Sequence, residues 1–146
     1  MLVPMFGDPI VGVLFGTLLY MAVYSAWLLS IANSANQKLE VPLKKSPKWM
    51  VIGLAYAAIY LIAALVVLPG FLDESQGLPG FIVPFHLLAM VGIFYALLFA
   101  AKSLVTLERN QAPTFFDYSG PFFLLWFFPI GVWFVQPRVN KLLGER

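Results

Sequence analysis

Long uncharged stretches, separated by short polar segments, are the dominant pattern of this chain. Three such stretches begin near residues 9, 49 and 84. About 20 apolar residues are enough to cross the hydrocarbon core of a bilayer, so the pattern predicts transmembrane helices at about 9–32, 49–69 and 84–109. The last of these passes Lys102, emerges into water and is stopped by Pro113.

Helix-start and turn signals agree with these bounds. Asp8 before Pro9, and Ser46 before Pro47, each place a capping side chain next to a proline that tolerates the first helical turn. The connecting segments are short, and none has room for a catalytic domain of its own. We therefore expect one all-α integral membrane domain that covers residues 1–146.

The last hydrophobic segment, residues 121–136, has two interpretations. It is about 16 residues long, or about 24 Å of helix against a core of about 30 Å, and Pro129 removes a backbone donor in its middle. We favour a re-entrant hairpin that turns at Pro129–Gly131, and the alternative is a kinked fourth transmembrane helix. A turn inside the bilayer needs shelter from other helices.

The positions of the basic residues predict an orientation. Four lysines, Lys38, Lys44, Lys45 and Lys48, follow the first helix, whereas the second loop carries Asp73 and Glu74 and no basic residue. Positive residues favour the cytoplasmic side, so the N-terminus is expected outside and the first loop inside. If the terminal segment turns back, all nine basic residues lie inside.

Composition excludes several classes of protein. The chain is 61% hydrophobic and 11% charged, with a mean hydropathy of +0.86, whereas soluble domains carry about 25% charged residues. The net charge of +2 comes from basic residues beside apolar segments, which favours topology determinants over nucleic-acid binding. There is no cysteine, so thiolate, disulfide and cysteine-metal chemistry are excluded.

His86 is the single histidine and the one candidate cofactor contact. It is predicted near the outer end of the third helix, where it either bonds a neighbouring helix or contacts a quinone, lipid or haem. A membrane haem usually needs two axial ligands, so a haem would be shared with a partner chain. Lys44, Lys45 and Lys48 are a topology signal, and their charge also predicts contact with anionic lipid headgroups.

Two sets of residues are candidates for helix packing. Small residues at four-residue spacing let helix backbones approach closely, and they occur at Gly12 and Gly16 and again at Gly92, Ala96 and Ala100. The second set is the aromatic terminal segment, in which the residues selected as a partner interface are Phe122, Trp126, Phe127, Pro129, Gly131 and Trp133.

The terminal segment also resembles a known kind of sequence. The run Phe116–Tyr118, the run Trp126–Trp133 and the run Gln136–Asn140 are similar to the ending of small uncharacterised bacterial inner-membrane proteins. The resemblance covers about the last third of the chain. It implies a bacterial inner membrane and assigns no activity to any residue.

The sequence therefore favours a non-catalytic accessory or assembly subunit of a larger membrane complex. No Walker loop, His-Glu-x-x-His motif, Gly-x-Ser-x-Gly motif or metal-ligand set is present, so no enzyme is expected. Other integral membrane subunits and the bilayer are the expected partners. One alternative is a binder of a hydrophobic cofactor or lipid, with His86 as the contact. The third is a homo-oligomeric transporter or channel, which is disfavoured because the predicted helices of this chain carry no charge at mid-depth.

Overall fold

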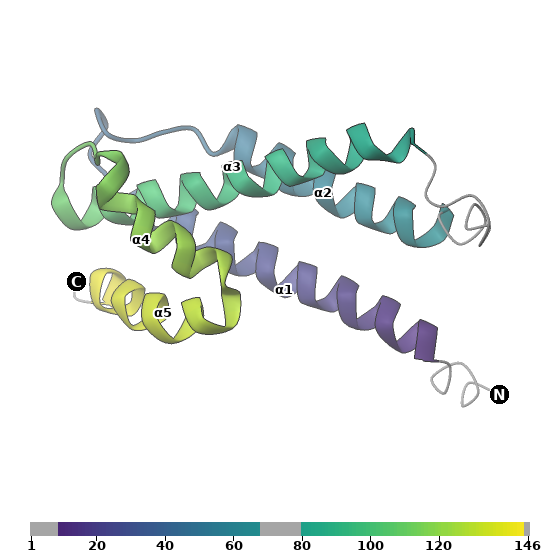
Figure 1. Cartoon of the computed structure of the whole chain (residues 1–146). Helices are drawn as coiled ribbons and strands as arrows, with labels where there is room; N and C mark the ends of the chain where they lie inside the picture. Colours follow the sequence, from purple (N-terminus) through teal and green to yellow (C-terminus); the bar gives the residue numbers. More distant parts are fainter. Residues whose placement is uncertain (1–8, 68–79, 145–146) are drawn as a thin grey trace.

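The computed structural model describes residues 9–67 and 80–144, and the described part of the chain is all-helical without strands. The five helices are α1 (Pro9–Lys38), α2 (Lys48–Val67), α3 (Ile82–Arg109), α4 (Phe115–Trp126) and α5 (Phe128–Gly144). Figure 1 shows α2 and α3 side by side, α1 crossing them and diverging toward its N-terminal end, and α4 and α5 folded against one end of the bundle.

Three of these helices are long and apolar enough to cross a membrane, namely α1, α2 and α3. The uncharged stretches predicted three membrane-spanning helices, and the length and apolar composition of α1, α2 and α3 confirm this prediction. Asp8, Asp73 and Glu74 lie outside the described residues, as do residues 68 and 69, the last two of the predicted second helix.

The first helix is longer than predicted and continues to Lys38. Its last two turns are polar in composition, which is why the apolar pattern placed the end near residue 32. Within these turns Ala35 and Asn36 are buried. Packing of one side of the extension, rather than hydropathy, keeps it helical.

The backbones of α2 and α3 are in close contact at two glycines. A β-carbon on Gly53 would lie 2.9 Å from the Cα of Gly92, and one on Gly92 would lie 2.8 Å from the Gly53 carbonyl oxygen. Real side chains do not pack at such distances, so each glycine is needed for this crossing. Helix association in lipid depends on such close backbone contact, because lipid tails are as apolar as the side chains they replace.

The terminal segment folds as two helices, which begin earlier and end later than the predicted 121–136. Its break falls at Phe127, whose backbone (φ −85°, ψ 69°) leaves the helical region. The predicted turn at Pro129–Gly131 is therefore shifted. Pro129 instead lies in the first turn of α5, where a missing N–H has no helical partner to lose.

Gly131 holds the two arms of this hairpin together. Its N–H donates to the Phe127 carbonyl (2.7 Å), so the chain is already helical here. A β-carbon on Gly131 would lie only 1.9 Å from the carbonyl oxygen of Leu124. Gly131 thus allows α4 and α5 to pack in close contact. The unit formed by α4 and α5 is called the terminal hairpin below.

The core lies where the second half of α1, the second half of α3 and the terminal hairpin meet. Its fully buried large side chains include Leu28, Leu97, Leu104, Leu125 and Val135. The first half of α1 carries exposed side chains such as Val13 and Phe15, in agreement with its divergence from α3 in Figure 1.

Candidate functional site

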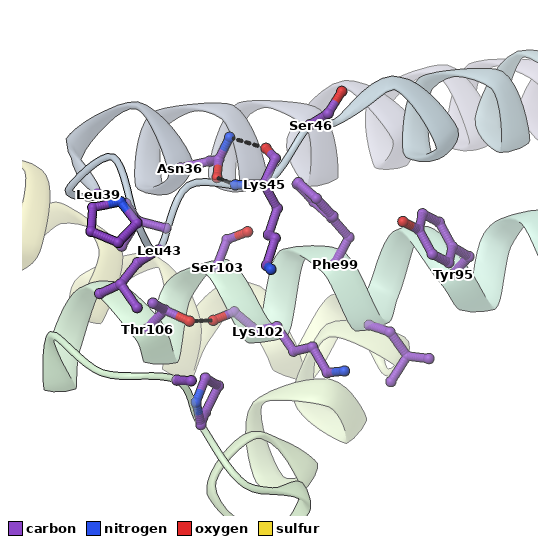
Figure 2. A pocket seen from close by; sticks show the side chains of 14 residues that line it. Asn36, Leu39, Leu43, Lys45, Ser46, Tyr95, Phe99, Lys102, Ser103 and Thr106 are labelled. Atoms are coloured by element: carbon purple, nitrogen blue, oxygen red, sulfur yellow. Dashed lines mark hydrogen bonds between the residues drawn. The ribbon is translucent and has the colours of Figure 1, made fainter.

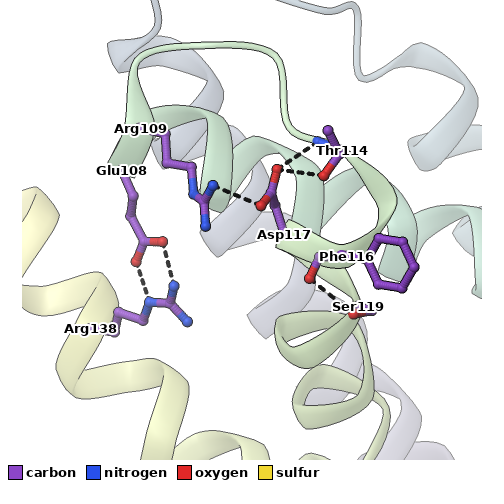
Figure 3. A network of polar contacts seen from close by, with 7 residues as sticks. All are labelled: Glu108, Arg109, Thr114, Phe116, Asp117, Ser119 and Arg138. Atoms are coloured by element: carbon purple, nitrogen blue, oxygen red, sulfur yellow. Dashed lines mark hydrogen bonds and ion pairs between the residues drawn. The ribbon is translucent and has the colours of Figure 1, made fainter.

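Both ends of the terminal hairpin are attached to the same end of the bundle. At its start, Arg109 of α3 pairs with Asp117 of α4 at 2.7 Å. On its return, Arg138 of α5 makes a two-pronged ion pair with Glu108, the residue next to Arg109 (Figure 3). The terminal hairpin therefore leaves and rejoins the bundle at the C-terminal end of α3.

A cation also closes the end of α5. The Nζ of Lys38, the last residue of α1, donates to the carbonyls of Leu142 (3.3 Å) and Leu143 (2.8 Å). The final carbonyls of a helix have no partner within the helix, and a positive group there also opposes the negative end of the helix dipole. The long polar extension of α1 is what brings Lys38 to this position.

The start of α4 is fixed by a local cap. The backbone N–H and the hydroxyl of Thr114 both donate to the Asp117 carboxylate, at 2.8 Å and 2.7 Å. These bonds from the Thr114 hydroxyl and N–H, together with the Arg109 guanidinium, lower the pKa of Asp117 from its ordinary value of 3.8. The carboxylate thus stays ionised where it caps α4 and pairs with α3.

The bend of the terminal hairpin is sheltered by α1. The Tyr24 hydroxyl donates to the Leu125 carbonyl (3.1 Å), which lies in the last turn of α4. Phe128, the first residue of α5, lies edge-on to the rings of Tyr20, Tyr24 and Trp27. The last carbonyls of a helix have no partner within the helix, and here a side chain of α1 bonds one of them.

A second polar connection joins α1 to α5. The indole N–H of Trp27 donates to the Gln136 side-chain oxygen at 2.8 Å, and the Gln136 amide donates to Asn140 at 2.9 Å. Trp27 and Gln136 are both partly buried. This pair fixes α5 against α1 two residues before Arg138, which makes the ion pair with Glu108.

The predicted interface residues of the terminal segment divide between two sides. Phe122 stacks on Phe94 of α3, and Gly131 is buried, so both face inward. The other side carries large exposed side chains, here called the outer aromatic face: Phe123 (51% exposed), Trp126 (44%), Phe127 (58%), Ile130 (54%), Trp133 (81%) and Phe134 (64%). Pro129 is exposed beside them.

The two small-residue sets occupy different positions. Gly92 lies against Gly53, and Ala96 and Ala100 are fully buried within the chain. By contrast, a β-carbon on Gly12 or Gly16 would meet no atom of the described chain within 4 Å. Among the described residues, therefore, nothing covers the Gly12–Gly16 side of α1.

A pocket of about 520 Å³ lies where the loop after α1 meets α3 (Figure 2). Its polar lining includes Lys45 of the loop together with Lys102, Ser103 and Thr106 of α3. Figure 2 shows the Lys45 side chain reaching from the loop toward α3. Lys44 and Lys48, predicted with Lys45 as headgroup contacts, do not line it, and the Lys48 ammonium instead lies 5.9 Å from the Trp49 ring.

A smaller apolar groove of about 240 Å³ lies between α1 and α3 beside the terminal hairpin. Its lining residues are Tyr20, Tyr24, Met90, Ile93, Phe94, Leu97 and Trp126. The Trp126 ring closes one side, edge-on to Phe94. His86 lines neither this groove nor the larger pocket.

His86 contacts a neighbouring helix, and its Nδ1 lies 3.2 Å from the Tyr60 hydroxyl of α2. The two rings are also in edge contact, 5.7 Å apart. Among the described residues, no three His, Asp or Glu side chains are grouped as a metal site. His86 is thus placed as a contact between α2 and α3 near the start of α3.

Comparison with known proteins gave no match: no protein-family model, curated protein or solved structure is similar to this chain. The resemblance of the terminal segment to small bacterial membrane proteins consequently stays an expectation.

Proposed function

We propose that this chain is a non-catalytic accessory or assembly subunit of a larger complex in the bacterial inner membrane. The observation that carries the proposal is the terminal hairpin, which is fixed on one side by α1 and α3 and presents the outer aromatic face on the other. Large rigid aromatic side chains supply contact area at a low cost in conformational entropy, which suits recognition of another membrane subunit.

The proposed arrangement in the bilayer has three spanning helices and a re-entrant terminal hairpin. The arms of the terminal hairpin are short, about 18 Å for α4 and about 26 Å for α5. Ion pairs join both arms to Glu108 and Arg109 at the same end of α3. The bend is covered by α1, because Tyr24 bonds the Leu125 carbonyl. With the N-terminus outside, the basic loop after α1 and the basic end of α5 both lie in the cytoplasm.

The uncovered side of α1 supplies a second contact in this proposal. Gly12 and Gly16 are exposed on a helix whose second half is packed, and small residues allow a partner helix to approach. The expected partner is therefore a helical membrane protein that contacts both the first half of α1 and the outer aromatic face. The resemblance to small bacterial membrane proteins is compatible with this role.

Purification of the tagged chain in mild detergent tests the proposal. An accessory subunit is expected to co-purify with other membrane proteins in a fixed ratio. The double variant Trp133→Ala/Phe134→Ala is expected to lose them, and Phe85→Ala, which removes an exposed ring (54%) on α3, to retain them. A chain that purifies alone, or the same loss in both variants, would contradict the proposal.

A further inference from the structure

The pocket between the loop after α1 and α3 carries positive charge that the chain does not neutralise. Lys45 and Lys102 line it, and no carboxylate does. In the described part of the chain, the ion pairs use Arg109 and Arg138, which leaves both lysines without a carboxylate within 4 Å. The Lys102 ammonium lies 4.9 Å from the Tyr118 ring, a contact that adds no negative charge.

Neutral hydrogen-bonding groups accompany the two lysines. The hydroxyl-bearing residues Ser46 and Ser103 line the pocket, and Figure 2 shows the Ser103 hydroxyl beside the Lys45 side chain, whereas the Ser46 hydroxyl points away from it. Ammonium groups and hydroxyls are donors that phosphate oxygens accept. The polar part of the pocket is therefore suited to a phosphate group.

The position of Lys45 is set before any ligand binds. The Asn36 side chain, which is 6% exposed, donates to the Lys45 carbonyl (2.7 Å) and accepts from the Lys45 N–H (3.0 Å). Two bonds from one buried amide fix this loop residue against the end of α1. A lysine whose backbone is held in place loses less conformational entropy on binding than one on a free loop.

An apolar part of the lining follows α3 away from the lysines toward the middle of the helix, whereas Leu39 and Leu43 lie on the other side, near Thr106 (Figure 2). Tyr95, Leu98 and Phe99 lie on α3 one to two turns before Lys102. From residue 95 to Thr106, α3 advances about 16 Å along its axis. The pocket thus changes from cationic to apolar along a spanning helix, as the boundary between headgroups and acyl chains does.

We propose that this pocket binds an anionic phospholipid, with its phosphate between Lys45 and Lys102 and an acyl chain along Tyr95, Leu98 and Phe99. This inference depends on α3 crossing the bilayer but not on the accessory function or on any protein partner. A soluble phosphate ester offers the same charge without the apolar tail, so the test separates the two ligands.

Native mass spectrometry of the purified chain measures the bound lipid directly. After delipidation, the chain is titrated with phosphatidylglycerol or with phosphatidylcholine of the same acyl chains. One retained phosphatidylglycerol is expected per chain, bound more tightly than phosphatidylcholine. Lys45→Gln should weaken phosphatidylglycerol binding about fivefold, because one basic residue near an anionic surface contributes about 1 kcal/mol. Lys45→Gln/Lys102→Gln loses two such contributions and should weaken binding about thirtyfold. Lys45→Gln alone leaves the Lys102–Tyr118 contact in place.

The matched control is Lys44→Gln/Lys48→Gln, which removes the same amount of charge from the loop and the first residue of α2, outside the pocket. It should retain phosphatidylglycerol as the unmodified chain does. The proposed site would be contradicted if the chain bound the two lipids equally, or if both double variants lost phosphatidylglycerol to the same extent. Displacement of the lipid by millimolar glycerol phosphate would contradict a lipid ligand and indicate a soluble phosphate ester instead. None of these outcomes depends on whether other proteins co-purify.

Discussion

The backbone of Leu124 occupies the space that a side chain on Gly131 would need. A β-carbon at Gly131 would lie 1.9 Å from the Leu124 carbonyl oxygen, so the two arms of the terminal hairpin touch through backbone atoms. This contact, rather than flexibility at a glycine, accounts for the fold-back of the last segment.

Gly131→Ala should open or distort the terminal hairpin. The added methyl group cannot fit against Leu124, and overpacking of this kind costs about 1–3 kcal/mol. Thermal unfolding in detergent, followed by tryptophan fluorescence, measures the loss. Gly120→Ala is the control on α4, because its β-carbon meets nothing within 4 Å. A Gly131→Ala protein as stable as the Gly120→Ala protein would contradict the packing described here.

The α2–α3 crossing should be equally intolerant of side chains. Gly53→Ala or Gly92→Ala places a methyl group within 3.0 Å of the opposite backbone, and we expect a loss of about 1–3 kcal/mol in the same assay. Gly12→Ala and Gly16→Ala should leave the stability of the isolated chain unchanged. If these two destabilise it as strongly, the first half of α1 is packed in the isolated chain after all.

Tyr24→Phe should weaken the attachment of the terminal hairpin while leaving the core volume intact. It removes the donor to the Leu125 carbonyl at the bend. Hydrogen bonds between membrane helices contribute on average about 0.6 kcal/mol and at most about 1.7 kcal/mol. Tyr20→Phe is the matched control, since the structure gives the Tyr20 hydroxyl no hydrogen bond within the described residues. Equal stability of the two variants would exclude a role for this bond.

The start of the terminal hairpin should respond to acid. The pKa of Asp117 is lowered in the folded protein, so its ionised form stabilises the fold above the unfolded value of 3.8. This contribution is lost as the pH falls through the lower, folded pKa. Carbon-detected NMR of the Asp117 carboxyl should show a midpoint below 3.8 that rises in Thr114→Val. A midpoint unaffected by Thr114→Val would contradict the assignment of the shift to the Thr114 cap.

Much of the transmembrane part was predictable because its determinants are local. The uncharged runs place α1, α2 and α3, and the Ser46–Pro47 signal places the start of α2 at Lys48. The polar end of α1 was missed because its helix depends on burial of Ala35 and Asn36, which the apolar pattern does not show. Thr114 and Asp117 were a readable capping signal for α4, three residues apart, before an apolar run.

The candidate sites depended more on contacts between distant residues. The bend was expected at Pro129, the strongest local signal, yet a proline fits the first turn of α5 and the break moved to Phe127. Lys45 and Lys102 lie on different elements, and no sequence spacing predicts that one pocket joins them. Gly53, the partner of Gly92, has Ala57 four residues later, so a small-residue spacing was present in the second helix but was not selected as a packing candidate.

The direction of the terminal segment is the central claim, and cysteine labelling tests it most directly. The chain has no cysteine, so single cysteines at Lys44, Gly80 and Lys141 report the first loop, the second loop and the return of α5. A membrane-impermeant thiol reagent is added to intact spheroplasts and again after lysis. The account predicts that Gly80→Cys reacts from outside, whereas Lys44→Cys and Lys141→Cys react only after lysis. Reaction of Lys141→Cys from outside together with Gly80→Cys would show a fourth span and contradict the hairpin.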